Sequence, residues 1–353
     1  MDLTVLNRDF EKIGVIDDFT SLIWHRKFYT SGTFKIDLPM TDNNLALVQE
    51  KNIIHKPGSD EAGIIDNYYY RSDEEGRETI EASGYFLTGL LARRIVPKLT
   101  TLYASYRDAM RSLVNQNAIA TDSKRIIPHL ELSKVEEDTA EKKRLQCTGK
   151  NLLTYLGKLS QVSEIGFKCR YMRTHMEFYT YTGKDRSRRQ NINPRVIFAH
   201  EYDNLGSTEY TYNEIDTITA AYVGGEGEGA ARTIIEVDNG ATGLDRYEVF
   251  VDSGASREEG MTDAEYLRIL NQEGLEVFTP AAENFAGTMV NSRTTIYKQD
   301  FDLGDVVTVF NKRWNKELSV RITEVEEVND TNGERIVVYF GSTERTLADI
   351  LNE

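Results

Sequence analysis

Short runs of alternating hydrophobic and polar residues dominate the first quarter of the chain. Phe34, Ile36 and Leu38 are separated by one charged residue each, which is the period of a strand with one buried face. Further short strand candidates, separated by turns rich in Asn, Asp, Ser and Gly, are Leu3–Val5, Ile13–Ile16, Leu22–Trp24, Ile64–Tyr70 and Thr79–Ala82. We therefore expect residues 1–92 to form a barrel-like β domain. A short helix should start at Thr41 or Asp42.

Helical periodicity replaces this alternation over residues 93–200. Ser105 and Asp108 resemble a capping pair at a helix start. The apolar residues that follow recur at helical spacing, and they are Ala109, Met110, Leu113 and Val114. A second helical face consists of Leu152, Leu156 and Leu159, and Phe167–Tyr181 reads as a pair of strands. We expect an inserted α+β domain over residues 93–200.

Strand-like runs return from residue 201. Thr262 and Glu265 form a capping box that predicts a helix through Leu270, and Gly274 would end it. We expect a second β-barrel domain built from residues 201–237 and 285–345, interrupted by a small helix-containing insert at residues 238–284. The fold class is then mainly β with α+β insertions: two β-barrel-like domains and two smaller inserted domains.

A glycine-rich loop spans residues 224–229. A phosphate-binding loop presents backbone N–H groups at a helix N-terminus, usually with a Lys nearby. This loop contains Glu226 and Glu228, which repel phosphate, and it leads into the β-branched run Thr233–Val237. The loop is therefore predicted to join two strands, and no nucleotide or other cofactor is expected.

Charge is distributed unevenly along the 353 residues, whose net charge is −15. Residues 93–200 hold 21 basic and 10 acidic residues, a net charge of +11, and the remainder carries −26. The acidic part is unsuited to holding nucleic acid. It fits either a conduit through which DNA slides or an ordinary soluble surface. The basic run Lys184–Arg189 could contact nucleic acid, dock on an acidic partner or remain a solvated loop.

Targeting and metal-binding signals are missing from the sequence. The N-terminus lacks a secretory signal, and no apolar run approaches the roughly 18 residues of a membrane span, so synthesis in a cytoplasm without membrane insertion is expected. Cys147 and Cys169 are expected to be free thiols. The five histidines are scattered, so we expect no zinc site.

Several residue patterns suggest chemistry but have simpler structural interpretations. Asp330, Asn332, Gly333 and Glu334 match part of a calcium loop, yet an Asn-Gly turn in a hairpin explains them better. Cys147 with His175 lacks the surroundings of a known lysin site. Paired carboxylates that could serve a glycosidase are Asp17–Asp18, Glu74–Glu75, Glu136–Asp138, Glu258–Glu259 and Glu326–Glu327, in segments where solvated charge is more usual. We therefore predict no catalytic residue.

Aromatic residues could in principle stack on sugars. In the run Tyr68–Tyr70, a strand would place Tyr68 and Tyr70 on one face and Tyr69 on the other, as in ordinary packing. Trp24 and Trp314 are expected to be core or interface anchors.

Three stretches in a fixed order resemble the tail-tip (baseplate) hub proteins of long-tailed bacteriophages and prophages, the family that includes the N-terminal region of tail-associated lysins. They are Leu3–Pro39, Ile218–Asp252 and a C-terminal stretch that consists of Tyr297–Val309 and Ser319–Val328. Within the third, Gly304 suits a turn before the strand Val306–Val309, and this turn is not expected to be a site.

The resemblance implies a structural, non-enzymatic virion protein. Three subunits, each with two similar barrels, would form a hub ring at the distal end of a phage tail. The ring would join the tail tube and distal tail protein to a spike, fibre or lysin, and DNA would pass through it during ejection. The protein would be made in the bacterial host cytoplasm and end in the virion tail tip.

Two other functions remain open at this stage: a cell-wall hydrolase and a carbohydrate-binding tail-tip module. Residues 343–353 can form only a short final helix. Any hydrolytic region is therefore expected on another chain or on a part of the protein outside this sequence.

Overall fold

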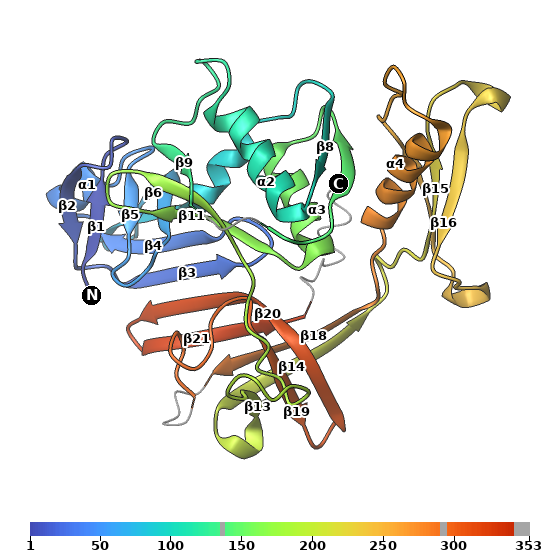
Figure 1. Cartoon of the computed structure of the whole chain (residues 1–353). Coiled ribbons are helices and arrows are strands. Elements are labelled where there is room, and N and C mark those ends of the chain that lie inside the picture. Colours follow the sequence, from blue (N-terminus) through green and yellow to red (C-terminus); the bar gives the residue numbers. More distant parts are fainter. Residues whose placement is uncertain (135–137, 290–294, 342–353) are drawn as a thin grey trace.

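The computed structural model describes residues 1–134, 138–289 and 295–341 (Figure 1). Residues 1–86 form antiparallel strands: β1 (Leu3–Leu6), β2 (Lys12–Ile16), β3 (Ser21–Lys27), β4 (Thr33–Pro39), β5 (Ile53–His55), β6 (Ala62–Ser72) and β7 (Glu78–Phe86). The six predicted strands are confirmed, and the three-residue β5 was not foreseen. Phe34, Ile36 and Leu38 are buried as their alternation predicts. The predicted helix is α1 (Asp42–Leu47), capped by Thr41.

A second group of strands comes mainly from the last third of the chain. It consists of β13 (Ile197–Ala199), β14 (Leu205–Asn213), β18 (Ala282–Met289), β19 (Val306–Asn311), β20 (Lys316–Asp330) and β21 (Gly333–Phe340). The short helix η3 (His200–Tyr202) lies between β13 and β14. The predicted Asn332-Gly333 hairpin is confirmed between β20 and β21. Gly333 has φ 106°, and the Asp330 carboxylate accepts a hydrogen bond from the Asn332 N–H at 2.8 Å.

The two groups of strands are not separate barrels. β20 is 15 residues long and pairs with β19, β21 and β3, the last from Glu324 opposite Lys27 to Asp330 opposite Ser21. One sheet therefore runs in the order β14-β18-β21-β20-β3-β4-β7-β6-β5-β1-β2, and no closed barrel is seen among the described strands. We call the strands on either side of the β3–β20 pairing the first and second halves of the sheet.

The α+β segment packs on the first half (Figure 1). Its elements are η1 (Leu87–Arg93), β8 (Thr100–Ala104), α2 (Tyr106–Val114), the π-helical η2 (Asn115–Ile119), β9 (Leu130–Leu132), β10 (Lys143–Cys147), α3 (Leu152–Ser163), β11 (Gly166–Tyr171) and β12 (Met176–Tyr181). The two helices and the strand pair are as predicted, and Ser105 caps α2. Leu152 and Leu156 share one core with Leu6 and Ile53 of the first half.

Residues 214–281 form a separate lobe between β14 and β18, which we call the insert lobe. Its elements are β15 (Ala220–Gly224), η4 (Gly229–Ala231), β16 (Ile234–Asp238), η5 (Gly243–Asp245), β17 (Glu248–Asp252) and α4 (Asp263–Glu276). The strands form their own sheet, β16-β15-β17, with α4 packed on one face around a separate core. The division expected at residues 237 and 238 thus falls within this sheet.

Helix α4 shows one expectation met and one missed. The capping box of Thr262 and Glu265 is present at its start. Gly274 does not end the helix, which continues to Glu276. A methyl group added at Gly274 would lie 2.7 Å from Val237 Cγ2, so this glycine allows α4 to approach the sheet closely.

In the described part of the chain, none of the helices has the length and apolar character needed to cross a membrane. The predicted final helix over residues 343–353 lies outside the described residues.

Candidate functional site: the sheet junction and the lobe contact

A buried ionic cluster holds the two halves of the sheet together, and we call it the junction cluster. Arg26 on β3 is 3% exposed. Its Nε donates to Glu61 Oε2 at 2.8 Å, and its Nη1 donates to Asp302 Oδ1 at 2.7 Å and to the Tyr297 hydroxyl at 2.7 Å. Burial lowers the pKa of Arg26, but Tyr297, Glu61 and Asp302 raise it, and the pKa lies well above its ordinary value. The guanidinium therefore stays charged and links residues from both halves.

Glu327 on β20 extends the cluster. It pairs with Lys56 and with Lys298, whose Nζ lies 3.1 Å from Oε1, and it accepts a hydrogen bond from Tyr297 at 3.1 Å. Burial raises the pKa of Glu327, but Lys56 and Lys298 lower it, with a net shift below the ordinary value. Lys56 belongs to the first half and Lys298 to the second, so the carboxylate adds another bridge.

The opposite face of the β3–β20 pairing carries a smaller ionic group. His25 Nε2 lies 2.6 Å from Glu324 Oε2, and Lys27 Nζ lies 3.2 Å from the same oxygen. The His25 ring stacks on Tyr339 with centroids 5.8 Å apart. Burial raises the pKa of Glu324, whereas His25 and Lys27 lower it below its ordinary value. Both faces of the junction are thus fixed by charged pairs.

The turn before β19 supplies part of the junction cluster. Asp302 binds Arg26, as described above. Asp305 accepts hydrogen bonds from the Lys184 N–H at 2.7 Å and from Arg186 Nε at 2.7 Å. Gly304 has φ 92°, and a methyl group there would lie 2.4 Å from the Phe28 ring. The predicted turn is confirmed, and its carboxylates also have a structural role that the sequence did not reveal.

The insert lobe contacts the α+β segment through polar side chains. Thr101 donates to Glu258 at 2.6 Å, and Arg144 lies 3.4 Å from Glu258 and 3.6 Å from Glu265. Gln146 exchanges two hydrogen bonds with the backbone of Ser256. Further along α4, Gln272 donates to the Tyr106 hydroxyl at 2.6 Å. We call this set the lobe contact.

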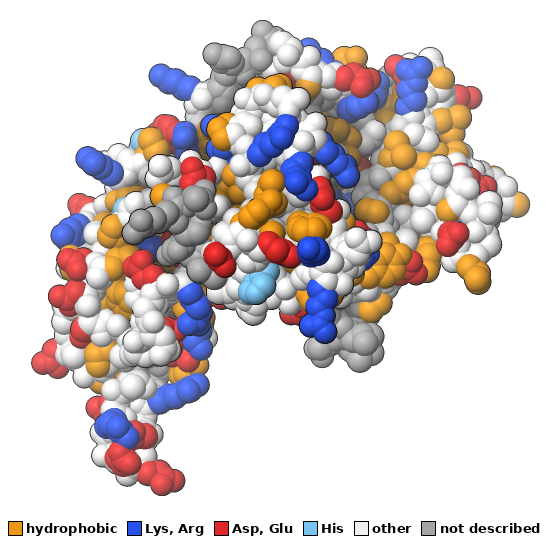
Figure 2. Space-filling model, turned by 90° about the horizontal axis from the view of Figure 1, so that it is seen from below, with side chains coloured by type: hydrophobic (Ala, Val, Ile, Leu, Met, Phe, Trp, Pro, Cys, Tyr) orange, Lys and Arg blue, Asp and Glu red, His pale blue; other side chains and the backbone are white. Residues whose placement is uncertain are grey.

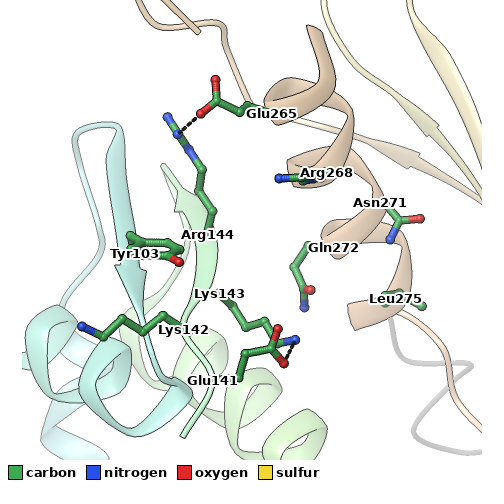
Figure 3. A pocket seen from close by; sticks show the side chains of 10 residues that line it. All are labelled: Tyr103, Glu141, Lys142, Lys143, Arg144, Glu265, Arg268, Asn271, Gln272 and Leu275. Atoms are coloured by element: carbon green, nitrogen blue, oxygen red, sulfur yellow. Dashed lines mark hydrogen bonds and ion pairs between the residues drawn. The ribbon is translucent and has the colours of Figure 1, made fainter. Parts of the chain in front are cut away.

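A polar cleft of about 720 Å³ runs beside the lobe contact (Figure 3). One wall is α4, with Glu265 and Arg268, and the other consists of β8, β10 and the residues before β10, with Tyr103 and Arg144. The Arg144–Glu265 pair spans the two walls. Opposed charges thus bridge the lobe and the segment, whose described apolar residues belong to two separate cores.

The end of α4 places a half-buried acidic residue, Glu276, beside this contact. Burial raises the pKa of Glu276 to about 7, while Gln272 lowers it and Glu273 raises it further. Lys158 on α3 and Lys150 before it lower the pKa less. Glu276 therefore changes its protonation near neutral pH at the boundary between the lobe and the segment.

The predicted free thiols are confirmed, and both are buried. Burial raises the pKa of Cys147 and of Cys169 to about 12, so neither favours the reactive thiolate. His175 lies 3.7 Å from Glu177, and no interaction between His175 and either thiol occurs among the described residues.

The carboxylate pairs occupy structural positions. Asp18 binds Asn44 at 2.9 Å, and Glu75 pairs with Arg77 in the β6–β7 turn. Glu258 belongs to the lobe contact and Glu327 to the junction cluster, whereas Glu136 and Glu137 lie outside the described residues. Within the ranges that the structure describes, no three His, Cys, Asp or Glu side chains gather as for a metal ion.

The aromatic residues follow their packing interpretation. Tyr68 and Tyr70 share one face, with ring centroids 5.6 Å apart, while Tyr69 contacts Arg71. Trp24 is fully buried in the core of the first half of the sheet. Trp314 is 41% exposed and packs on Phe285.

The glycine-rich loop and the basic run are also partly structural. The loop joins β15 to β16 as predicted. In the basic run, Arg186 is buried against Asp305, and Arg188 lies 3.1 Å from Glu317. Only part of this run therefore remains available to a partner.

Sequence reasoning missed Arg26 and Glu61, which lie 35 positions apart, because no local motif joins them. One signal was present: Arg26 follows Leu22 and Trp24 on the buried face of an alternating strand. A charged residue at such a position needs a buried partner.

Comparison with known proteins agrees with this architecture. The prophage MuSo2 43 kDa tail protein from Shewanella oneidensis is similar over 96% of this chain and 98% of its own, with a TM-score of 0.61 and 12% identity. A tail protein from Neisseria meningitidis has a TM-score of 0.58, 12% identity and 96% coverage of both chains. Prophage tail protein gp18 from Listeria monocytogenes has a TM-score of 0.57 and 11% identity, over 100% of this chain and 98% of that one. These likenesses concern the fold.

No curated protein matches the chain. A family model described as Siphovirus ReqiPepy6 Gp37-like protein matches residues 2–342. The chain therefore belongs to this siphovirus tail protein family, and it is a phage tail-type structural protein.

Proposed function

We propose that this chain forms a trimeric hub ring at the distal end of a phage or prophage tail. The observation that carries the proposal is the continuous sheet across β3 and β20, fixed by buried charges. A ring component must transmit load between the parts above and below it without coming apart. Two halves joined by backbone pairing and a buried ionic cluster suit that task, and the family assignment supports a tail location.

In this proposal each subunit contributes two β halves to the ring. Three subunits then present six similar parts, which lets a threefold tip meet a sixfold tube. The ring joins the tail tube and distal tail protein to a spike, fibre or lysin. DNA passes through during ejection, and the net charge of −26 outside residues 93–200 keeps its phosphates from adhering.

The proposed role requires no catalysis. Burial and raised pKa values disfavour nucleophilic attack by Cys147 and Cys169. Glu258 and Glu327 serve contacts within the chain. Cell-wall cleavage is assigned to another chain of the tail tip.

The proposal is tested in tails assembled by the phage or prophage that encodes this chain. A labelled copy is expected at the distal end of the tail in electron micrographs, and deletion of the chain is expected to yield tails without a complete tip. Tails that assemble and eject DNA normally without the chain would refute the proposal.

Two further assays address the rival functions. Purified chain should leave the turbidity of cell-wall suspensions unchanged, and clearing would favour a hydrolase. Glycan binding by single subunits that never assemble would favour a carbohydrate-binding module.

A further inference from the structure

Opposite charge separates two parts of this chain. The insert lobe, residues 214–281, has 15 acidic and 4 basic residues, a net charge of −11. Residues 93–200 have a net charge of +11. Within one chain the lobe meets this segment through α4 and the loop before it, which carries Ser256 and Glu258 (Figure 1).

The other face of the lobe sheet carries the Arg246 side chain, whose guanidinium pairs with Glu236 and Glu248. Residues Ile234 and Glu236 on β16 and Glu248 and Phe250 on β17 lie on this face, because they alternate with the core residues that pack against α4. We call these four residues the lobe face. Ile234 is 52% exposed and Phe250 is 53% exposed. Figure 2 shows hydrophobic side chains exposed beside acidic ones on the lobe, at the right of the view.

Phe250 is held in place although it is exposed. A methyl group added at Gly224 would lie 2.7 Å from Phe250 Cζ, so the ring lies across this glycine. The Arg232 guanidinium sits 5.5 Å from the ring centroid. A large exposed aromatic side chain fixed in this way loses little entropy when it is covered, as is typical of interface anchors.

A matching surface exists on the α+β segment. Contacts of Arg94 and Arg125 join two stretches of this segment, and we call the exposed apolar and basic residues of these stretches the basic patch: Arg93, Ile95, Lys98, Leu99, Lys124 and Ile126. Ile95 is 50% exposed. Arg93 Nη2 lies 3.1 Å from Asp66 Oδ1, whereas no ion pair of Lys98 or Lys124 occurs among the described residues.

Backbone contacts hold the basic patch together. Arg94 Nε donates to the Arg125 carbonyl at 2.6 Å, and Arg125 Nη2 donates to the Ile95 carbonyl at 2.6 Å. Burial lowers the pKa of Arg94, and the neighbouring Arg125 and Arg93 lower it further. Three guanidinium groups thus crowd together, and a partner that brings carboxylates would relieve their repulsion.

We infer that the lobe face of one copy docks on the basic patch of the next copy around the ring. The inference rests on the proposed function and specifies one of its contacts. Carboxylates Glu236 and Glu248 meet the cations, and Phe250 and Ile234 cover the exposed aliphatic residues. The two surfaces differ, so the contact is heterologous and repeats head to tail until the ring closes. The acidic lobe face would repel nucleic acid, which excludes DNA as its occupant.

The test is a charge exchange, measured as the mass of the purified chain by light scattering over a range of concentrations. One variant carries Glu236→Lys and Glu248→Lys, another carries Lys98→Glu and Lys124→Glu, and a third carries all four substitutions. Each two-site variant should raise the dissociation constant of the assembly at least about tenfold, because like charges then face each other. The four-site variant should return most of the lost affinity.

One further variant tests the apolar part of the contact, and another serves as a control. Phe250→Ser leaves the ion pairs of Glu236 and Glu248 with Arg246 intact and should weaken assembly at least about tenfold. Glu74→Lys with Glu78→Lys reverses two exposed charges at the β6–β7 hairpin and should leave the mass unchanged. Circular dichroism checks that every variant is folded.

The outcomes distinguish the inference from the proposed function. A trimer whose mass is unchanged in all these variants overturns the inference but agrees with the proposed trimeric ring. An assembly that is not a trimer, but that the two-site variants weaken and the four-site variant restores, supports the contact and refutes the trimer. A wild-type chain that stays monomeric at low salt and high concentration refutes both.

Discussion

The sheet junction and the lobe contact join parts of the same chain in different ways. At the junction, backbone hydrogen bonds continue from β3 to β20, and Arg26 and Glu61 are almost completely buried. At the lobe contact, side chains meet across a polar cleft, and the Glu258 and Glu265 side chains are 44% and 41% exposed. The junction therefore makes one body of the two halves, whereas the lobe has a sheet and a core of its own.

The two regions also respond to pH with opposite sign. At the junction, the pKa values of Glu324 and Glu327 are lowered, so these groups stabilise the fold at neutral pH. At the lobe contact, the pKa of Glu276 is raised to about 7 by burial. Acidification from about pH 7 to about pH 4 should therefore strengthen the lobe contact, and only further acidification should weaken the junction.

Removal of Arg26 should produce the largest effect. Arg26→Ala leaves Glu61 as an unpaired buried charge, and we expect a loss of about 3–5 kcal/mol in the free energy of unfolding. Urea denaturation measures it. The control is Arg77→Ala, whose side chain is 72% exposed, with an expected change of at most about 1 kcal/mol. Equal effects of the two substitutions would contradict the buried role of Arg26.

The pH dependence gives the next largest effect. The folded pKa of Glu276 exceeds its unfolded value, so its stabilisation is complete below about pH 4 and is lost as the pH rises through about 7, with at most about 3 kcal/mol involved. Fluorescence energy transfer between labels on α4 and on β8 should show the lobe moving away over this range.

Glu276→Gln is the matched control for that experiment. The amide keeps the size of the side chain but cannot ionise, so the label distance should no longer depend on pH between 4 and 7. A pH dependence that persists in this variant would assign the titration to another group, such as Glu273, whose pKa is also raised by burial.

The stability of the lobe can be changed without touching the junction. Gly274→Ala forces a methyl group against Val237 and should destabilise the lobe by about 1–3 kcal/mol. Hydrogen exchange should quicken in β15, β16 and α4 and stay constant in β3 and β20. Gly157→Ala in α3 is the comparison, since its methyl group meets only the Tyr29 carbonyl, at 3.2 Å. Equal quickening in β3 and β20 would show that the lobe and the junction unfold together.

The smallest effect should come from Arg144. Arg144→Ala removes two partly exposed ion pairs, so the lobe contact should weaken by about 0.5–1 kcal/mol. The same label distance reports the change. Arg268→Ala, which removes a cation from the same cleft, should alter it less, and a larger effect at Arg268 would point to a contact with another molecule.

Local patterns predicted the elements well, because alternation and capping depend on neighbouring residues. Phe34, Ile36 and Leu38 are on the buried side of β4, and Ser105 and Thr262 cap their helices. Which strands pair with one another was harder to predict. β15 and β16 have the strand-like pattern of the second half and were expected to belong to it, whereas β15 pairs with β16 on one side and with β17 on the other.

The junction lay beyond sequence reasoning for the same reason. Arg26 and Asp302 are 276 positions apart, and the sequence around either residue does not indicate the other as its partner. Gly274 was read as a helix end because glycine often has that role, and its actual contact with Val237 depends on tertiary packing.

The most direct test of the account is the symmetry of the assembled chain, seen by electron microscopy of purified material or of tail tips. We expect three copies around a central opening, with both halves of each sheet in the ring and each insert lobe touching the next copy. A reconstruction with isolated subunits, or with the two halves of one chain separated, would contradict the account.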